Sequence, residues 1–412
     1  MATQPVNQPE TESEKQPQLY TNFFQQHILN GVDYWCTHAA VQTIDVPVLD
    51  EKRENILKAI SLGLGVDEAW PLVRQLIIDL ATYMERRGFW DVWHVMLERA
   101  IVTAQRVSDL DGETTLTALL ARVCQRESQL AETVRYYRRV IKLARQTGNR
   151  YEEARACSNL GFLYIESGYW WRSEVLSGRA LAIFDKLENM HGQAHTHNHL
   201  GCLYTRQCHW KQAQGHLKLA CDIWRDMDDK HGLMRGNENL GVLYNEVKKA
   251  DDAIIHLNKA LQYAELVGDE AQRGFLLNNL GIAYRDKQNL DLAENYVKEA
   301  EAIFDRASNQ AGLTLVWWNL GLIQKEQEQW DAAIKSFEQS LANSYELKNF
   351  HGVIDLLLEL IESEVALENR LQATIRFDEL QSILVLHKPN RQHVSLLAKI
   401  KDCENTMHQF LV

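Results

Sequence analysis

The tripeptide Asn-Leu-Gly, or a close variant of it, recurs at a constant interval of about 40 residues through the middle of this 412-residue chain. The five copies begin at Asn159, His199, Asn239, Asn279 and Asn319. A tyrosine follows the leucine by four positions in four of the copies, and a small residue follows the glycine by nineteen positions in all five. A fixed period of this length is typical of a solenoid built from one repeated supersecondary element, so it constrains the fold more than any isolated motif.

The same frame extends in both directions without a gap. Leu80 and Leu120 hold the leucine position upstream, and Leu360 holds it downstream. The frame therefore predicts eight repeats over residues 72–387.

Each repeat predicts two helices. In the third repeat, small and apolar residues from Ala154 to Tyr164 follow the i, i+3, i+4 spacing of a helix face, Gly168 interrupts the pattern, and a second pattern runs from Val175 to Phe184. The glycine and alanine columns would let the two helices approach closely. Proline is costly inside helices, and none occurs between Pro71 and Pro389. The sequence therefore predicts an all-α fold.

These columns resemble the tetratricopeptide repeat. The resemblance implies a right-handed superhelical solenoid of antiparallel helix pairs, here with about eight repeats of 40 residues instead of the usual 34. Forty-residue versions with Asn-Leu-Gly are similar to the arrays of spindle-orientation adaptors, and to those of bacterial MalT-like activators and signalling ATPases. The phosphate-binding sequence G-x-x-x-x-G-K-[ST] is absent from this chain, so no ATPase module is expected.

The two ends depart from the repeat pattern. We expect residues 1–18 to be a disordered tail and residues 19–71 to form an irregular helical cap or docking element, with helices around 19–43 and 50–62. Residues 72–387 would be the array. Residues 388–412 would supply a C-terminal capping helix, which a solenoid needs to cover its last apolar face.

The resemblance also implies that the first helix of each pair lines a concave groove. The ladder residues Asn159, His199, Asn239, Asn279 and Asn319 would then face that groove. An amide side chain has both a donor and an acceptor, so it can pair with the backbone of a bound peptide. The alternative is that each asparagine ties its own helix to the next one, and the two roles are compatible.

Neighbouring positions vary between repeats and would set specificity. Arg155, Arg235, Arg285 and Lys325 could form a basic floor that suits an acidic segment. Phe275 and Trp318 would add an apolar pocket toward the C-terminal end. The alternative is a mixed-charge surface in which carboxylates such as Asp286 pair with these cations.

One segment is rich in possible metal ligands: His191, His195, His197, His199, Cys202, Cys208 and His209. His195 and His199 are four residues apart and share a helix face, a spacing that can hold Zn²⁺. Polar substitution within the repeat also explains them, and no H-E-x-x-H sequence is present. We therefore expect no metal and no other cofactor. The alternative is a metal site formed by this segment.

Composition excludes several classes of function. The net charge of −12 argues against broad nucleic-acid affinity, and no apolar run is long enough to span a membrane. Seven scattered cysteines without a C-x-x-C pair are typical of reduced thiols in a cytoplasmic protein. No catalytic motif stands out, so we do not expect an enzyme.

The sequence therefore predicts a non-catalytic scaffold or adaptor that binds an extended or helical segment of a protein partner in the groove. The alternative is a regulatory protein whose superhelix tightens when a peptide or other ligand binds.

Overall fold

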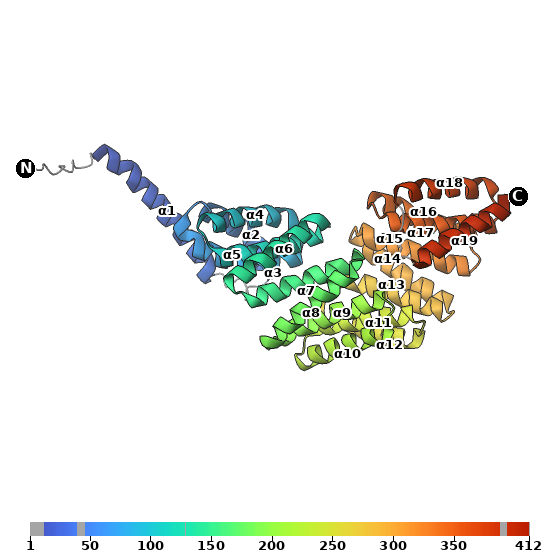
Figure 1. Ribbon diagram of the computed structural model, residues 1–412. Coiled ribbons are helices and arrows are strands. Elements are labelled where there is room, and N and C mark those ends of the chain that lie inside the picture. The colour runs from blue at the N-terminus through green and yellow to red at the C-terminus, as the bar shows by residue number, and fades with distance from the viewer. Residues whose placement is uncertain (1–11, 39–45, 128, 388–393, 412) are drawn as a thin grey trace, which may run out of the picture. The chain divides into compact units, whose positions relative to one another are not determined.

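The computed structural model describes residues 12–38, 46–127, 129–387 and 394–411, and within these ranges it contains α helices, one short 3-10 helix and no strand (Figure 1). The helices are α1 Glu12–His38, α2 Val46–Gly63, α3 Trp70–Arg87, α4 Trp90–Arg106, α5 Leu110–Arg126, α6 Leu130–Thr147, α7 Arg150–Glu166, α8 Trp170–Lys186, α9 Met190–Arg206, α10 Trp210–Asp226, α11 Lys230–Glu246, α12 Ala250–Val267, α13 Glu270–Asp286, α14 Leu290–Arg306, α15 Gln310–Glu326, α16 Trp330–Glu346, α17 Phe350–Ala366, α18 Arg370–Leu386 and α19 Val394–Leu411.

From α3 to α18 the helices begin at a constant interval, at positions 70, 90, 110, 130 and so on to 370, and they are nearly equal in length. Two consecutive helices therefore make one repeat of the predicted period. The predicted all-α fold of about eight such repeats is confirmed. The first helix of the array, α3, begins at Trp70, slightly before the predicted repeat frame begins at residue 72.

The N-terminal segment is more regular than expected. Residues 1–11 of the expected tail lie outside the described residues, and α1 begins at Glu12, inside that segment. Pro47 was expected between two helices, but it is the second residue of α2, where its missing N–H is not needed by the helix.

The C-terminal segment begins with residues 388–393, which lie outside the described residues. After them, α19 occupies the segment in which a capping helix was expected.

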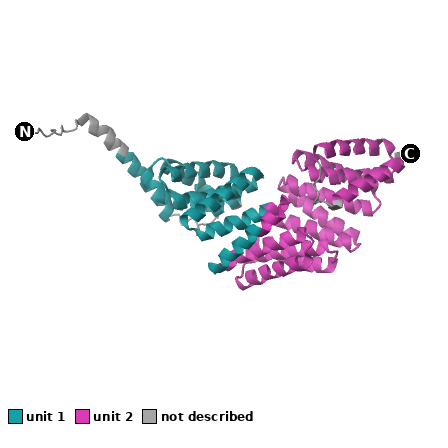
Figure 2. Ribbon diagram, in the orientation of Figure 1, with its two compact units in different colours: residues 1–163, 175–188 teal, residues 164–174, 189–412 magenta. Residues whose placement is uncertain are grey.

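The chain divides into two compact units (Figure 2). Unit 1 comprises residues 1–163 and 175–188, and its apolar core is contributed by α1 to α5. Unit 2 comprises residues 164–174 and 189–412, and within it each helix from α9 to α18 packs against the next. Among the described helices, none has both the length and the apolar character needed to cross a lipid bilayer.

A very short connection joins each helix of the array to the next. In the turn before α11, Asp228 adopts a left-handed conformation with φ of 52°, and its N–H donates to the carbonyl of Arg225. The N–H of Asp229 donates to the carbonyl of Trp224 at 2.9 Å, which completes a Schellman motif. Left-handed residues recur at every turn from Gly88 to Glu368, apart from position 128, which is not described. This turn ends a helix without proline, which accounts for the proline-free stretch.

The last residue of that connection also starts the next helix. The Asp229 carboxylate accepts a hydrogen bond from the N–H of Gly232 at 2.9 Å, as an N-cap residue does. An aspartate or asparagine does the same at the start of every repeat from the second to the eighth: Asp109, Asn149, Asn189, Asp229, Asp269, Asn309 and Asn349. Each repeat boundary therefore has its own local stop and start signal.

The glycine of Asn-Leu-Gly brings the two helices of a repeat together. A Cβ atom on Gly241 would lie 2.5 Å from Cγ of Leu257 on the paired helix, and one on Gly281 would lie 2.4 Å from a methyl group of Val297. Gly201 and Gly321 meet Leu217 and Phe337 in the same way. The predicted close approach is confirmed at these four repeats.

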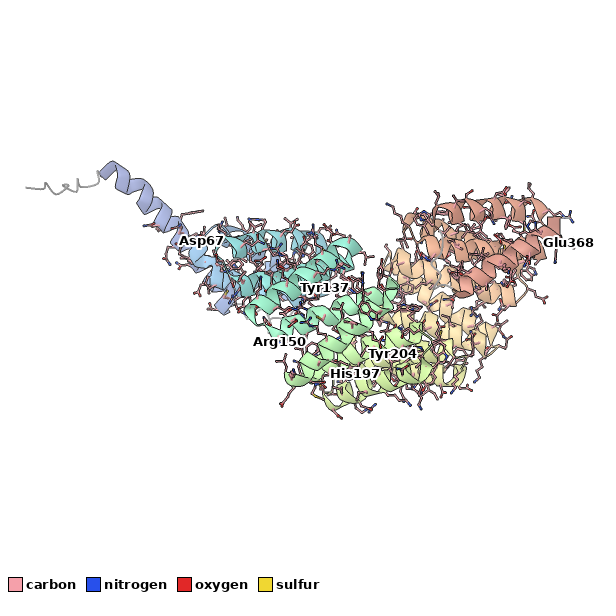
Figure 3. The ribbon with its side chains drawn as sticks, viewed as in Figure 1. Asp67, Tyr137, Arg150, His197, Tyr204 and Glu368 are labelled. Atoms are coloured by element: carbon pink, nitrogen blue, oxygen red, sulfur yellow. The ribbon has the colours of Figure 1, made fainter. Side chains whose placement is uncertain are left out.

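The tyrosine column packs on the second helix. Tyr204 stacks on His216 of α10 with ring centroids 5.4 Å apart, and His197 stacks on the same ring. Figure 3 labels Tyr204 and His197, which both belong to α9. Tyr244 stacks on His256 in the next repeat, so the column supports the helix pair.

We expect Gly241→Ala to lower the free energy of unfolding by about 1–3 kcal/mol, because the added methyl group overpacks against Leu257. Gly215 is the matched control: it is exposed in the middle of α10, and a Cβ there meets nothing within 4 Å. Gly215→Ala should therefore stabilise the chain by about 0.5–1 kcal/mol through helix propensity. Urea-unfolding midpoints check both values, and a shift in the same direction for both variants would contradict the packing role.

Candidate functional site

The first helices of four neighbouring repeats, α9, α11, α13 and α15, each carry a stripe of partly or fully exposed side chains. Within a helix the stripe follows steps of three or four residues, so its members share one face. The stripe surface consists of His195, His199, Cys202, Arg206; Arg235, Asn239, Val242, Glu246; Phe275, Asn279, Ile282, Asp286; and Leu315, Trp318, Leu322, Glu326. The paired helix and the adjacent first helices cover the other faces.

The stripe surface unites six of the predicted site residues: His199, Arg235, Asn239, Phe275, Asn279 and Trp318. Asn319 is buried beside it. Arg285 and Lys325 lie on the same helices, each directly before a stripe residue, with 14% and 17% of their side chains exposed. Arg155 and Asn159 lie on the part of α7 that belongs to unit 1, where the Asn159 side chain donates a hydrogen bond to the hydroxyl of Tyr137.

Two ladder asparagines tie one repeat to the one before it. The amide nitrogen of Asn239 donates to Oδ1 of Asn198 at 2.9 Å, and that of Asn319 donates to Oδ1 of Asn278 at the same distance. Both acceptors are buried and stand immediately before the ladder position of their own repeat. These bonds fit the structural role that the sequence left open, in which an asparagine ties its own helix to a neighbouring one. Peptide binding by the ladder stays a prediction.

Carboxylates accompany most of the predicted basic floor. The Arg285 guanidinium lies 3.4 Å from Glu326, and the Lys325 ammonium lies 2.6 Å from Glu359 and 3.0 Å from Glu362. In unit 1, Arg155 lies 3.3 Å from Glu152. These ion pairs match the mixed-charge alternative at three of the four positions. Arg235 is exposed, and there the basic floor stays a prediction.

The apolar end of the stripe surface combines packed and open side chains. Phe275 packs on Phe304 with ring centroids 4.7 Å apart, and Trp318 packs against the core formed by α16 to α19. Leu315 lies one turn before Trp318 on α15, with 45% of its surface exposed. The two aromatic residues are therefore anchored from behind, and Leu315 extends the apolar surface that they present.

Glu238 is a site residue that sequence reasoning did not single out. Burial raises the pKa of its carboxyl to about 7, while the nearby Arg235 and a 2.6 Å hydrogen bond from Gln272 act in the opposite direction. Burial, together with the neighbouring His199, His191 and Arg235, lowers the pKa of His195 to about 3. A carboxyl that titrates near neutral pH is a recognised mark of functional sites. The only sequence signal was its position directly before a ladder asparagine.

The structure separates the seven candidate metal ligands. His191 and His195 approach each other, with their Nε2 atoms 3.3 Å apart, and Oδ2 of Asp229 lies 3.6 Å from the Nε2 atom of His191. His197 instead faces His216, with 2.9 Å between their Nδ1 atoms. Cys208 occupies the left-handed position of a turn. Asp229 was missed because the repeat pattern does not reveal that the turn before α11 lies next to the histidines of the preceding repeat.

Comparison with known proteins supports the repeat assignment. Residues 233–306 and 276–346 match the tetratricopeptide repeat family model. Comparison with curated protein sequences gave no match.

Several solved structures share the fold. A signal transduction ATPase with numerous domains and a tetratricopeptide repeat sensor, from Pyrococcus horikoshii, is 13% identical with a TM-score of 0.58, over 82% of this chain and 53% of that chain. The apo quorum sensor NprR from B. thuringiensis is 13% identical with a TM-score of 0.59, over 88% and 99%. Aspartyl phosphate phosphatase F from Bacillus subtilis is 12% identical with a TM-score of 0.56, over 89% and 94%.

This chain thus spans about half the length of the ATPase and nearly the full length of the other two proteins. With the constant helix spacing and the glycine contacts, these matches show that the chain carries tetratricopeptide repeats over residues 233–346 and has the fold of tetratricopeptide repeat proteins.

Proposed function

We propose that this protein is a non-catalytic interaction protein that binds a peptide segment of a partner across the stripe surface of α9, α11, α13 and α15. The observation that carries the proposal is the continuity of that surface. Each of four adjacent helices leaves open a stripe that combines polar or charged and apolar side chains, while the paired and neighbouring helices pack against its other faces. An extended or helical segment laid across the stripes would meet all four repeats.

The composition of the stripes favours a segment with an apolar anchor. One fully buried apolar side chain contributes roughly 1.5–3 kcal/mol, whereas one hydrogen bond contributes about 0.5–1.5 kcal/mol net. Micromolar affinity needs about 8 kcal/mol. Phe275, Leu315 and Trp318 would therefore supply most of the affinity. Asn279 would hydrogen bond to the backbone of the bound segment and hold it in place.

Charge would orient the segment. Arg206 and Arg235 are exposed cations of the stripes, and Arg235 in particular suits an acidic side chain of the partner. Because Arg285 and Lys325 already pair with carboxylates, we propose one acidic residue where the segment crosses α11, and not an acidic segment throughout.

Two further parts of the proposal concern chemistry and location. We propose no enzymatic activity, although one protein with this fold is an aspartyl phosphate phosphatase. We propose a cytoplasmic location, because all seven cysteines are free thiols in the structure and burial raises the pKa of several, such as Cys202 to about 12.

A second candidate function is ligand sensing, in which the array tightens when the segment binds. Two of the structures with this fold are titled sensors. Helices α1 and α2 of unit 1 lie outside the repeats and would transmit the tightening of the array to a downstream partner.

Substitutions on the stripe surface test the binding role. A peptide selected from a random display library against the full chain serves as the ligand. We expect Leu315→Asp to raise its Kd at least tenfold, about 1.4 kcal/mol, because the charge replaces an apolar contact. Ile255→Asp is the matched control, since Ile255 is similarly exposed but lies on the second helix of its repeat. Equal losses of peptide affinity in the two variants, measured by calorimetry, would rule out the stripe surface as the binding site.

Small-angle scattering separates the two candidate functions. If the protein is a sensor, its radius of gyration falls when the selected peptide saturates it, and Leu315→Asp abolishes the change at the same peptide concentration. An unchanged radius with saturated peptide favours the scaffold and excludes tightening.

Glu238 should make stability depend on pH. The folded-state pKa of about 7 lies above the ordinary value of 4.5, so the folded chain binds more protons between those values. Stability contributed by the protonated carboxyl is present below pH 4.5 and is lost as pH rises through 7. We expect Glu238→Gln, which keeps an acceptor for Gln272, to raise the free energy of unfolding above that of wild type by about 2 kcal/mol at pH 8. At pH 4 the two proteins should differ little in stability.

Glu265→Gln on the exposed side of α12 is the control for this effect. Urea midpoints at the two pH values give the comparison. A Glu238→Gln difference that does not change with pH would contradict the assignment.

A further inference from the structure

We propose that His191, His195 and Asp229 form a binding site for one zinc ion, which would link the fourth and fifth repeats. The two histidines stand one turn apart near the start of α9. Asp229 comes from the turn before α11, so its carboxylate reaches them from the next repeat. We call these three residues the histidine–aspartate cluster.

The ligand atoms already stand at the separations that zinc requires. The two imidazole Nε2 atoms are 3.3 Å apart, and the Nε2 atom of His191 lies 3.6 Å from Oδ2 of Asp229. All three ligand atoms lie within 4.8 Å of one another. Tetrahedral zinc with bonds of about 2.0–2.2 Å holds its nitrogen and oxygen ligands about 3.3–3.5 Å apart. An ion can therefore enter with small side-chain movements.

Two of the ligands are held in place by their surroundings. Oδ1 of Asp229 accepts the N–H of Gly232 at 2.9 Å, which fixes the carboxylate and leaves Oδ2 on the side of His191. The imidazole of His195 packs edge-on against Trp224, which is fully buried, with ring centroids 5.2 Å apart. Supporting contacts of this kind orient ligands in metal sites.

The ligand set selects the class of metal. Two imidazoles and one carboxylate suit zinc and similar transition metals, whereas Mg²⁺ and Ca²⁺ prefer sets made of oxygen. His191 is 53% exposed, so an ion has access from solvent, and water would complete the coordination. Two histidines four residues apart on one helix face are a known zinc-binding arrangement.

A metal-free explanation also exists for the same geometry. One imidazole can donate an N–H···N bond to the other, and Asp229 can pair with a charged His191. That explanation predicts no saturable affinity for zinc, so a titration separates the two.

The test uses the full chain with His94→Ala, because His94, Cys124 and Glu127 in unit 1 form a second group of potential ligands. ZnCl₂ is titrated into the chelator-treated protein by calorimetry. We expect one site with micromolar Kd and a thermal midpoint that rises with zinc but not with MgCl₂. Asp229→Asn keeps the helix cap and removes the anionic ligand, so Kd should rise at least tenfold. His191→Ala should have a similar effect.

His231→Ala is the matched control, since His231 is an exposed histidine in the first turn of α11 and lies outside the cluster. It should leave Kd unchanged. Binding that persists in both Asp229→Asn and His191→Ala, or the absence of saturable zinc binding to the parent protein, would overturn the proposal.

Discussion

The contact between a glycine in the first helix and a large side chain in the second helix is the interaction on which the fourth to seventh repeats depend. Gly241 against Leu257 and Gly281 against Val297 bring two helices so close that a methyl group would not fit. Short helices gain little from their own hydrogen bonds, because nucleation is costly, and most of their stability in proteins comes from packing an apolar face. Close pairing buries the apolar face of each helix, and stacking the pairs buries what remains. The helices are therefore stable only as members of the array.

Polar contacts add a second level of order between repeats. The Asn239–Asn198 and Asn319–Asn278 bonds cross from one first helix to the preceding one, and Lys325 joins Glu359 in the repeat that follows. A buried amide or charge without a partner would cost about 1–3 kcal/mol or more, so these bonds favour one register of stacking. They also reduce the number of donors and cations that a ligand could use.

The proposed function follows from what those internal contacts leave open. Side chains that already serve the fold offer little to a partner, whereas Arg235, Asn279 and Leu315 on the stripe surface remain accessible. The proposed peptide is therefore defined by an apolar anchor near α15 and a charge near α11. The histidine–aspartate cluster lies at the first turns of α9 and α11, so a bound ion would hold together two of the four helices that carry that surface.

The sequence alone determined the fold class, the period of the repeat and the two helices within it. Each of these depends on signals that lie within one repeat and recur in the next, such as the glycine of Asn-Leu-Gly and the small residue nineteen positions later. The Asp or Asn cap at each repeat boundary was equally local and could have been read in the same way. The starts of the first repeat and of α1 were placed less well, because the repeat pattern fades there.

Only the tertiary structure decided which partners the polar side chains have. Asn239 finds its acceptor in the preceding repeat, Lys325 finds Glu359 in the following one, and Asp229 meets His191 across a turn between repeats. Periodicity determines which helix face a residue occupies. Which side chain of another repeat it pairs with depends on rotamers and on how separate helices stack. The physical reason is that a helix face is a local property of the chain, whereas a hydrogen bond between repeats is set by the packing of the whole array.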